Sequence, residues 1–213
     1  MIKSPFVVIE DALAPSLCEH VIKKLGLTVP SYDNNEPVKH ERIINTPDLL
    51  TAIQSCVQES VAEIEHRFNA IVKGMELPLF QQFFENPTRP AVSHGCENSK
   101  YARKKWVKVK DVDLIAVIWL KDFNSGVPLD PTFEVYGGKL EFPGYNFSLV
   151  AQRGTLVIYP ATPHFITAVS PILVGSLEQI KVPLKLTAPD DSAWEYCPED
   201  FPGTYKDWFL TMN

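Results

Sequence analysis

Two histidines carry the strongest chemical signal in this chain. His94 and His164 are seventy positions apart, and each lies at the edge of a run that is typical of a β-strand. Glu97 follows the first histidine closely and supplies a carboxylate. Two imidazoles and one carboxylate are the smallest protein ligand set for a non-haem ferrous site, because they leave positions open for substrate and oxygen. If these side chains converge, the sequence predicts an oxygenase; if they do not, it indicates only a β-rich domain.

The elements that must position these residues are two helices followed by many short strands. We expect helices over Pro15–Leu25, where proline fits the first helical position, and over 46–72, where a hydroxyl cap precedes apolar residues at helical spacing. Residues 28–45 are polar and rich in proline and asparagine, which indicates a loop. The glycine pair Gly137-Gly138 is expected to bend its strand. The predicted strands are 6–9, 77–84, 106–113, 114–120, 133–142, 147–150, 155–159, 165–169 and 177–186.

This order of elements predicts an α+β fold, mainly β. Its core would be a double-stranded β-helix, or jelly roll, with the N-terminal helices packed on one sheet. The 213 residues, of which 45% are hydrophobic, are enough for one domain over 1–213 with a full core. Its core would span about 6–186 and leave an aromatic tail over 188–213.

Charge and cysteine usage narrow the class of protein. The formal net charge is −6, whereas a generic nucleic-acid binder is usually basic, so we do not expect a nucleic-acid partner. The basic run around Trp106 alternates with valines, which favours a solvated strand face. The four cysteines form no CxxC pair, and no apolar run has the length of a signal peptide or a membrane span. We therefore expect reduced thiols, a cytoplasmic location and no membrane contact.

Several segments, taken in order, carry a resemblance to a known family. They are Ile9–Cys18, His94, Leu114–Leu120, Tyr136–Phe142, and Arg153–Pro160 followed by His164. Together they resemble the Fe(II)- and 2-oxoglutarate-dependent dioxygenases, in the branch similar to prolyl 4-hydroxylase. Each segment is weak by itself, and their order and spacing carry the resemblance. It covers the chain from Phe6 to Leu186.

The resemblance implies metal-binding and catalytic roles for His94, Glu97 and His164, but one position departs from the family pattern. The family usually has an acid two residues after the first histidine, where this chain has Cys96 and places the acid one residue later. Three readings stay open. Glu97, which we favour, reaches the metal from a bulged loop; Cys96 approaches as a thiolate; or no carboxylate binds, as in halogenating relatives where chloride takes its place.

The resemblance also implies 2-oxoglutarate as co-substrate, and its far carboxylate needs a fixed cation. In the family this cation lies on the strand after the second histidine. Of the two lysines on that strand, we favour Lys181 over Lys185. Gln179 shares its strand face and would orient the same carboxylate. Tyr159 or Tyr136 offers a donor to a cofactor oxygen, but we favour burial in a β core as the explanation of these tyrosines.

The function implied is hydroxylation of a C–H bond, with Fe(II), 2-oxoglutarate and O₂. By similarity the substrate is a peptidyl residue, prolyl above all, or a small amino-acid-like molecule. Three alternatives remain: a non-catalytic jelly-roll binding or structural module, a halogenase-like relative, and a cupin-like metal enzyme that ignores 2-oxoglutarate. The sequence predicts neither the exact substrate nor the oligomeric state.

Overall fold

The computed structural model describes residues 6–33, 36–37, 39–88, 90, 92–102, 105–150 and 152–187. Its helices are α1 (Pro15–Leu25), α2 (Pro47–Glu59) and α3 (Val61–Phe68), with short 3₁₀ turns η1 (Pro143–Tyr145) and η2 (Pro163–Phe165). The strands are β1 (Val7–Ile9), β2 (Tyr32–Asp33), β3 (Glu36–Pro37), β4 (His40–Ile43), β5 (Ile71–Met75), β6 (Leu79–Asn86), β7 (Val92–Gly95), β8 (Ser99–Ala102), β9 (Lys105–Lys108), β10 (Leu114–Trp119), β11 (Asp122–Asn124), β12 (Glu134–Gly137), β13 (Leu140–Phe142), β14 (Phe147–Leu149), β15 (Leu156–Pro160), β16 (Thr167–Val169) and β17 (Ile172–Thr187).

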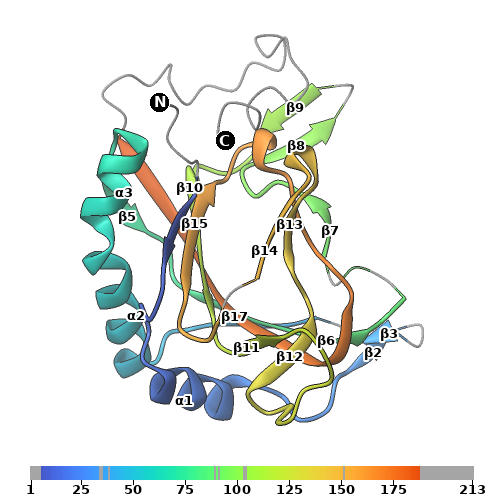
Figure 1. Ribbon diagram of the computed structural model, residues 1–213. Helices are drawn as coiled ribbons and strands as arrows, with labels where there is room; N and C mark the ends of the chain where they lie inside the picture. Colours follow the sequence, from blue (N-terminus) through green and yellow to red (C-terminus); the bar gives the residue numbers. More distant parts are fainter. Residues whose placement is uncertain are drawn as a thin grey trace.

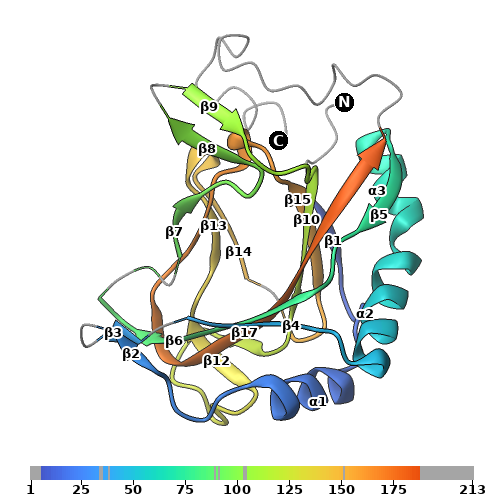
Figure 2. The same ribbon diagram turned by 180° about the vertical axis from the view of Figure 1, so that it is seen from behind.

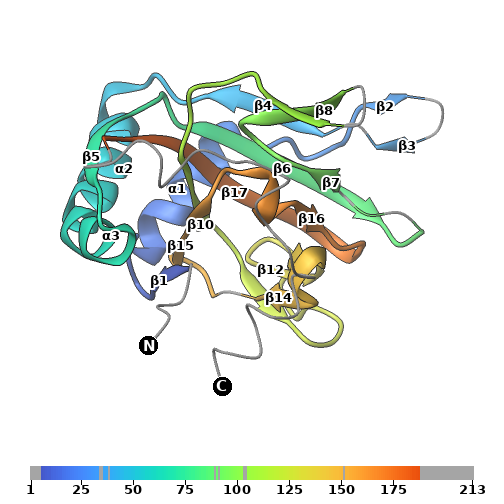
Figure 3. The same cartoon turned by 90° about the horizontal axis from the view of Figure 1, so that it is seen from above.

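Two facing sheets form the jelly roll, and the helices cover the outside of the larger sheet (Figure 1). The larger sheet has the order β1-β15-β10-β17-β12-β11, with β4, β5 and β6 attached, and the smaller sheet has the order β14-β13-β16-β7. Seen from behind and from above, all three helices lie on one side of the sheets (Figures 2 and 3). This arrangement confirms the predicted fold class.

Two hydrophobic cores lie on opposite faces of the larger sheet. Strand β10 is buried along its whole length, because both of its faces are covered. Successive side chains of a strand point to opposite faces, so its residues belong alternately to the two cores. Leu114, Ala116 and Ile118 pack toward the helices, and we call this the helix core. Ile115 and Val117 point between the two sheets, into what we call the inner core. The face of any strand that points into the inner core is its inner face.

The predicted helix over 46–72 is in fact two helices and the start of a strand. The Ser60 hydroxyl donates to the Cys56 carbonyl oxygen at 3.0 Å, a contact that bends helices, and α2 ends there. Asn69 takes the left-handed conformation and ends α3, after which β5 pairs with β17. The Thr46 side chain makes no capping hydrogen bond. Helical periodicity predicted the buried face of these helices correctly. It also continued into residues that pair with β17 and form β5.

The region 28–45, predicted as a loop, contains three short strands. The longest, β4, pairs with β6 and extends the larger sheet. Its side chains are mostly exposed, so it lacks the apolar alternation that marks a half-buried strand. The loop prediction was therefore wrong for a physical reason: pairing with β6 stabilises a polar edge segment.

The glycine pair bends the chain from one sheet into the other, as predicted. Gly137 and Gly138 have φ angles of 92° and 71°, which favour glycine. Before the bend, β12 pairs with β17 in the larger sheet; after it, β13 pairs with β14 and β16 in the smaller one. A Cβ on Gly137 would lie 2.2 Å from the Pro171 carbonyl oxygen. Among the described helices, none combines the length and hydropathy of a membrane span.

Candidate functional site

Strand β17 carries two of the residues predicted to bind the co-substrate, Gln179 and Lys181, and both lie on its inner face. Leu177 belongs to the inner core, whereas Ile180 belongs to the helix core. Because side chains alternate, Gln179 and Lys181 point the same way as Leu177. Their register against β10 places Lys181 opposite Val117, itself an inner-core residue. The predicted cation therefore faces into the roll.

Lys181 and Glu97 form an ion pair with each other. The Lys181 Nζ donates to the Glu97 Oε1 at 2.9 Å. The two side chains are 14% and 30% exposed, so the pair is largely withdrawn from solvent. The sequence predicted separate roles for these residues, one at the co-substrate and one at the metal. The structure instead brings them into direct contact.

The loop between β7 and β8 fixes the position of Glu97. On one side of it, the Cys96 thiol donates to the Ala161 carbonyl oxygen at 3.0 Å. On the other side, the Asn98 backbone N–H donates to the same oxygen at 3.2 Å, and its side-chain amide donates to the Val112 carbonyl oxygen at 3.1 Å. Burial raises the pKa of Cys96, so this thiol is neutral and acts as a donor rather than as a thiolate.

His164 lies in η2, between two buried neighbours, Pro163 and Phe165. The Phe165 ring stacks on Tyr145 with centroids 5.2 Å apart, which anchors the turn in the inner core. Burial lowers the pKa of His164 to about 4. The imidazole is therefore neutral near pH 7, and the neutral form is the one that binds a metal.

Strand pairing brings the chain around His94 to the chain around His164. Gly95, next to His94 in β7, pairs with Thr167, which begins β16 three residues after His164. The side chain of His94 lies outside the described part of the structure, which gives its backbone alone. Within that described part, no group of three or more histidine, cysteine, aspartate or glutamate side chains is arranged to hold a metal ion.

Tyr159, the other predicted cofactor contact, is buried in the inner core beside this site. Its ring packs edge-on against Phe142 with centroids 5.2 Å apart. Burial raises the pKa of Tyr159, and the nearby negative charge of Glu97 raises it further, whereas a hydrogen bond with Thr167 opposes the rise. The phenol is thus a neutral group close to Glu97.

Sequence reasoning missed a chain of polar side chains beside Lys181. The Gln179 amide donates to the Gln81 Oε1 at 2.9 Å, Gln81 donates to the Glu41 Oε1 at 2.6 Å, and Lys39 Nζ lies 2.8 Å from the same oxygen. Burial raises the pKa of Glu41, but the hydrogen bonds from Lys39 and Gln81 outweigh it and hold the pKa below its ordinary value. Only the pairing of β4 with β6 brings Glu41 to Gln81, and no local pattern signals that pairing.

A second ion pair lies on the opposite face of β17 and is not part of this site. Lys121 Nζ lies 2.9 Å from the Glu178 Oε2, and the two side chains are 3% and 1% exposed. Gln82 donates to the other carboxylate oxygen at 2.8 Å and also bonds both backbone groups of Leu27. This network ties the end of α1 to the sheet, so we assign it a structural role.

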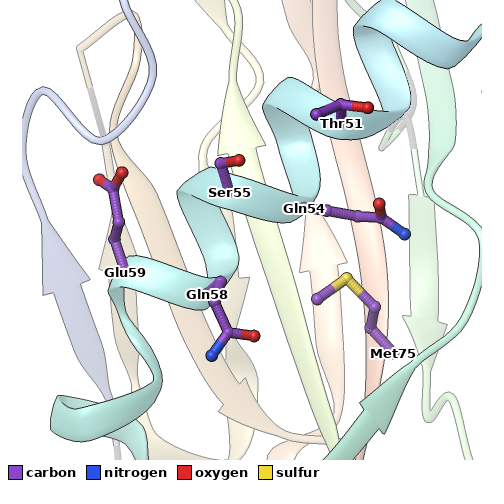
Figure 4. Close-up of a pocket in the computed structure, with 6 residues that line it drawn as sticks. All are labelled: Thr51, Gln54, Ser55, Gln58, Glu59 and Met75. Carbon is purple, nitrogen blue, oxygen red and sulfur yellow. The ribbon is translucent and has the colours of Figure 1, made fainter.

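A pocket on the outside of α2 carries none of the predicted site residues (Figure 4). Met75 of β5 lies beside the helix there, and polar α2 side chains form the rest of the lining. These are Thr51, Gln54, Ser55, Gln58 and Glu59. Because the lining supplies neither an imidazole nor a cation, the pocket does not fit the predicted chemistry.

Comparison with known proteins finds likeness in fold and none in sequence. No family model and no curated protein matches the chain. A viral collagen prolyl hydroxylase from Paramecium bursaria Chlorella virus-1, solved as its 2OG complex, superposes with a TM-score of 0.61 at 14% identity over 86% of this chain and 97% of that one. The chain has the prolyl hydroxylase fold. A Trichoplax adhaerens prolyl hydroxylase, solved with a hypoxia inducible factor peptide fragment, gives 0.60 at 15% identity over 89% of this chain and 85% of that one.

A third prolyl hydroxylase, a Pseudomonas putida prolyl-4-hydroxylase, gives a TM-score of 0.52 at 12% identity over 86% of this chain and 94% of that one. The fold thus agrees with the family that the sequence segments resemble, over most of the length of both chains. At these identities the likeness describes the architecture. The roles of individual residues must be argued from the site itself.

Proposed function

We propose that this protein is an Fe(II)- and 2-oxoglutarate-dependent oxygenase. One observation carries the proposal: in a prolyl hydroxylase fold, Lys181 lies on the inner face of β17 and holds a carboxylate, close to the loop that anchors on the chain before His164. A fixed cation facing a largely desolvated interior is what the far carboxylate of 2-oxoglutarate needs.

The residues around Lys181 fit that co-substrate. The Glu97 carboxylate at 2.9 Å acts as an internal stand-in, because it shows that an anion can reach this ammonium within the fold. Gln179, on the same strand face, is held by Gln81 and adds a polar side chain beside the cation. Tyr159 is a neutral phenol near the same position and is proposed as a further contact.

For the metal, we propose His94, His164 and Glu97 as ligands. Two nitrogens and one oxygen suit ferrous iron and leave positions open. When bound, iron supplies the activation of O₂ that couples oxidation of 2-oxoglutarate to hydroxylation of a C–H bond. The chain keeps the His164 imidazole neutral by burial, and it packs aromatic rings below the site that exclude water. Glu97 can offer both carboxylate oxygens to a metal only once it has left Lys181.

For the substrate, we propose a peptidyl residue, with proline first and a small amino-acid-like molecule second. The support is similarity: the neighbours are prolyl hydroxylases, and one was solved with a peptide fragment. No described residue of this chain selects between these substrates.

The test is spectroscopic. Under anaerobic conditions, Fe(II) plus 2-oxoglutarate should give the purified protein a weak visible charge-transfer band. Replacing His164→Ala or Lys181→Met should abolish or strongly weaken it. Lys185→Met is the matched control, because Lys185 lies on the same strand but pairs with Asp111 and not with Glu97. A protein that shows no band with any combination would contradict the proposed function.

One observation favours the second candidate, a non-catalytic jelly-roll module. The polar groups of the inner face already satisfy each other: Lys181 pairs with Glu97, and Gln179 bonds Gln81. A module of this kind needs no ligand to fold. If the protein is such a module, we expect no charge-transfer band and no rise in melting temperature with Fe(II). If it is an oxygenase, we expect both.

A further inference from the structure

The contact between Lys181 and Glu97 joins two residues to which the proposed function gives separate tasks. One carboxylate oxygen sits 2.9 Å from the ammonium, within the distance of a charge-assisted hydrogen bond. With the pair formed, Lys181 is neutralised and is a poor site for another anion. With Oε1 on Lys181, the same carboxylate cannot offer both of its oxygens to a metal bound by the histidines.

The backbone around Glu97 leaves its side chain as the part that moves. Cys96 and Asn98 on either side are bound to the Ala161 carbonyl oxygen, at 3.0 Å and 3.2 Å. A shift of the loop would break both bonds, whereas rotation of the Glu97 side chain breaks only the ion pair. At 30% exposed, this side chain borders solvent on one side.

The surrounding charges make displacement by an anion feasible. On this inner face, Lys39 pairs with Glu41, and Lys181 pairs with Glu97. Glu41 is held by Lys39 and by Gln81, so it keeps its own partners when Lys181 changes partner. An incoming carboxylate at Lys181 therefore replaces Glu97 in the ion pair, while Glu41, whose charge also acts on Lys181 through space, stays with Lys39 and Gln81.

We propose that Glu97 is an internal competitor for the anion position at Lys181, which a dicarboxylate co-substrate displaces, and that displacement frees Glu97 to bind the metal. This inference rests on the proposed function and adds a coupling between its two binding events. The co-substrate breaks the ion pair between Lys181 and Glu97, and the freed carboxylate becomes a ligand of the metal. Metal and co-substrate then help each other to bind, since coupling between two ligands is reciprocal.

The experiment measures binding by calorimetry on the full chain. The probes are 2-oxoglutarate on chelator-treated, metal-free protein, and Mn(II) on protein saturated with 2-oxoglutarate. Glu97→Gln should bind 2-oxoglutarate without metal about three- to tenfold more tightly than wild type, because the competing charge is gone. The same variant should bind Mn(II) about tenfold or more weakly, because it lacks the freed carboxylate.

Glu41→Gln is the matched control. It removes one negative charge from the same face, at an exposure close to that of Glu97, without touching the Lys181 bond. Because Glu41 acts on Lys181 only through space, Glu41→Gln should raise the 2-oxoglutarate affinity by clearly less than Glu97→Gln does, and it should leave the Mn(II) affinity unchanged. Adding Lys181→Met to Glu97→Gln should remove the gain in 2-oxoglutarate affinity, since the anion site itself is lost.

The outcomes separate this inference from the proposed function. Equal or weaker binding of 2-oxoglutarate by Glu97→Gln, with clear binding by wild type, overturns the competition and leaves the oxygenase proposal standing. Tighter 2-oxoglutarate binding with unchanged Mn(II) affinity overturns the transfer of Glu97 to the metal. If no variant binds 2-oxoglutarate, with or without Mn(II), the proposed function fails and this inference fails with it.

Discussion

At the scale of single residues, strand spacing predicted which way the side chains of the candidate site point, but not which residues they contact. Lys181 and Gln179 face the inner core, as their strand spacing required. Their partners, Glu97 and Gln81, come from segments far away in the chain, and only strand register and loop anchoring bring them close. No local pattern encodes such a contact, so the ion pair could not be predicted from spacing.

The buried imidazole of His164 gives the metal-free protein a predictable sensitivity to acid. Burial lowers its pKa from 6.5 to about 4. As the pH falls from about 6.5 to about 4, the unfolded chain gains a proton here that the folded protein does not, so the free energy of unfolding falls across that window. His164→Gln should therefore lose less stability than wild type between about pH 7 and pH 5.

Urea unfolding at several pH values measures this difference. His20→Gln is the control for the loss of an imidazole, because His20 is an exposed helix residue. Parallel pH profiles for wild type and His164→Gln would mean that the imidazole is protonated equally in both states, contrary to its burial.

At the scale of elements, apolar periodicity predicted the buried helices and strands. It missed the segments whose structure depends on hydrogen bonds to a neighbouring strand. It found α1 and the fully buried β10 close to their observed bounds. It missed β4, whose polar residues pair with β6, and it ran the second helix into β5. In both misses, hydrogen bonds to a distant strand decide the local structure, and those bonds leave no period in the sequence.

The bend at Gly137 should tolerate no side chain. Its φ of 92° strains any other residue, and a Cβ there would meet the Pro171 carbonyl oxygen at 2.2 Å. We expect Gly137→Ala to lower the free energy of unfolding by about 2 kcal/mol or more. Gly74→Ala is the control, because a Cβ on that strand glycine meets nothing within 4 Å. Chemical denaturation compares the two; similar midpoints would show that the bend relaxes around the new methyl group.

At the scale of the whole molecule, the two cores are not independent units. Strands β10, β15 and β17 contribute alternate side chains to the helix core and to the inner core. Ile118 and Val117, for example, are neighbours in the chain but belong to different cores. This double use explains why the fold class was predictable: the continuous apolar runs indicated strands covered on both faces.

Because the two cores share strands, we expect a destabilising substitution in one core to lower the stability of the other. Ile53 of α2 is fully buried in the helix core, and Ile53→Ala should lower the free energy of unfolding by about 2–5 kcal/mol. Because the strands beneath α2 also line the inner core, the slowest-exchanging amides of β13 in the opposite sheet should lose as much hydrogen-exchange protection as those of α2. The exposed Gln54→Ala, one residue away, should change neither. Loss confined to α2 would mean that the helices unfold separately from the roll, and the site between the sheets would then not depend on its helical cover.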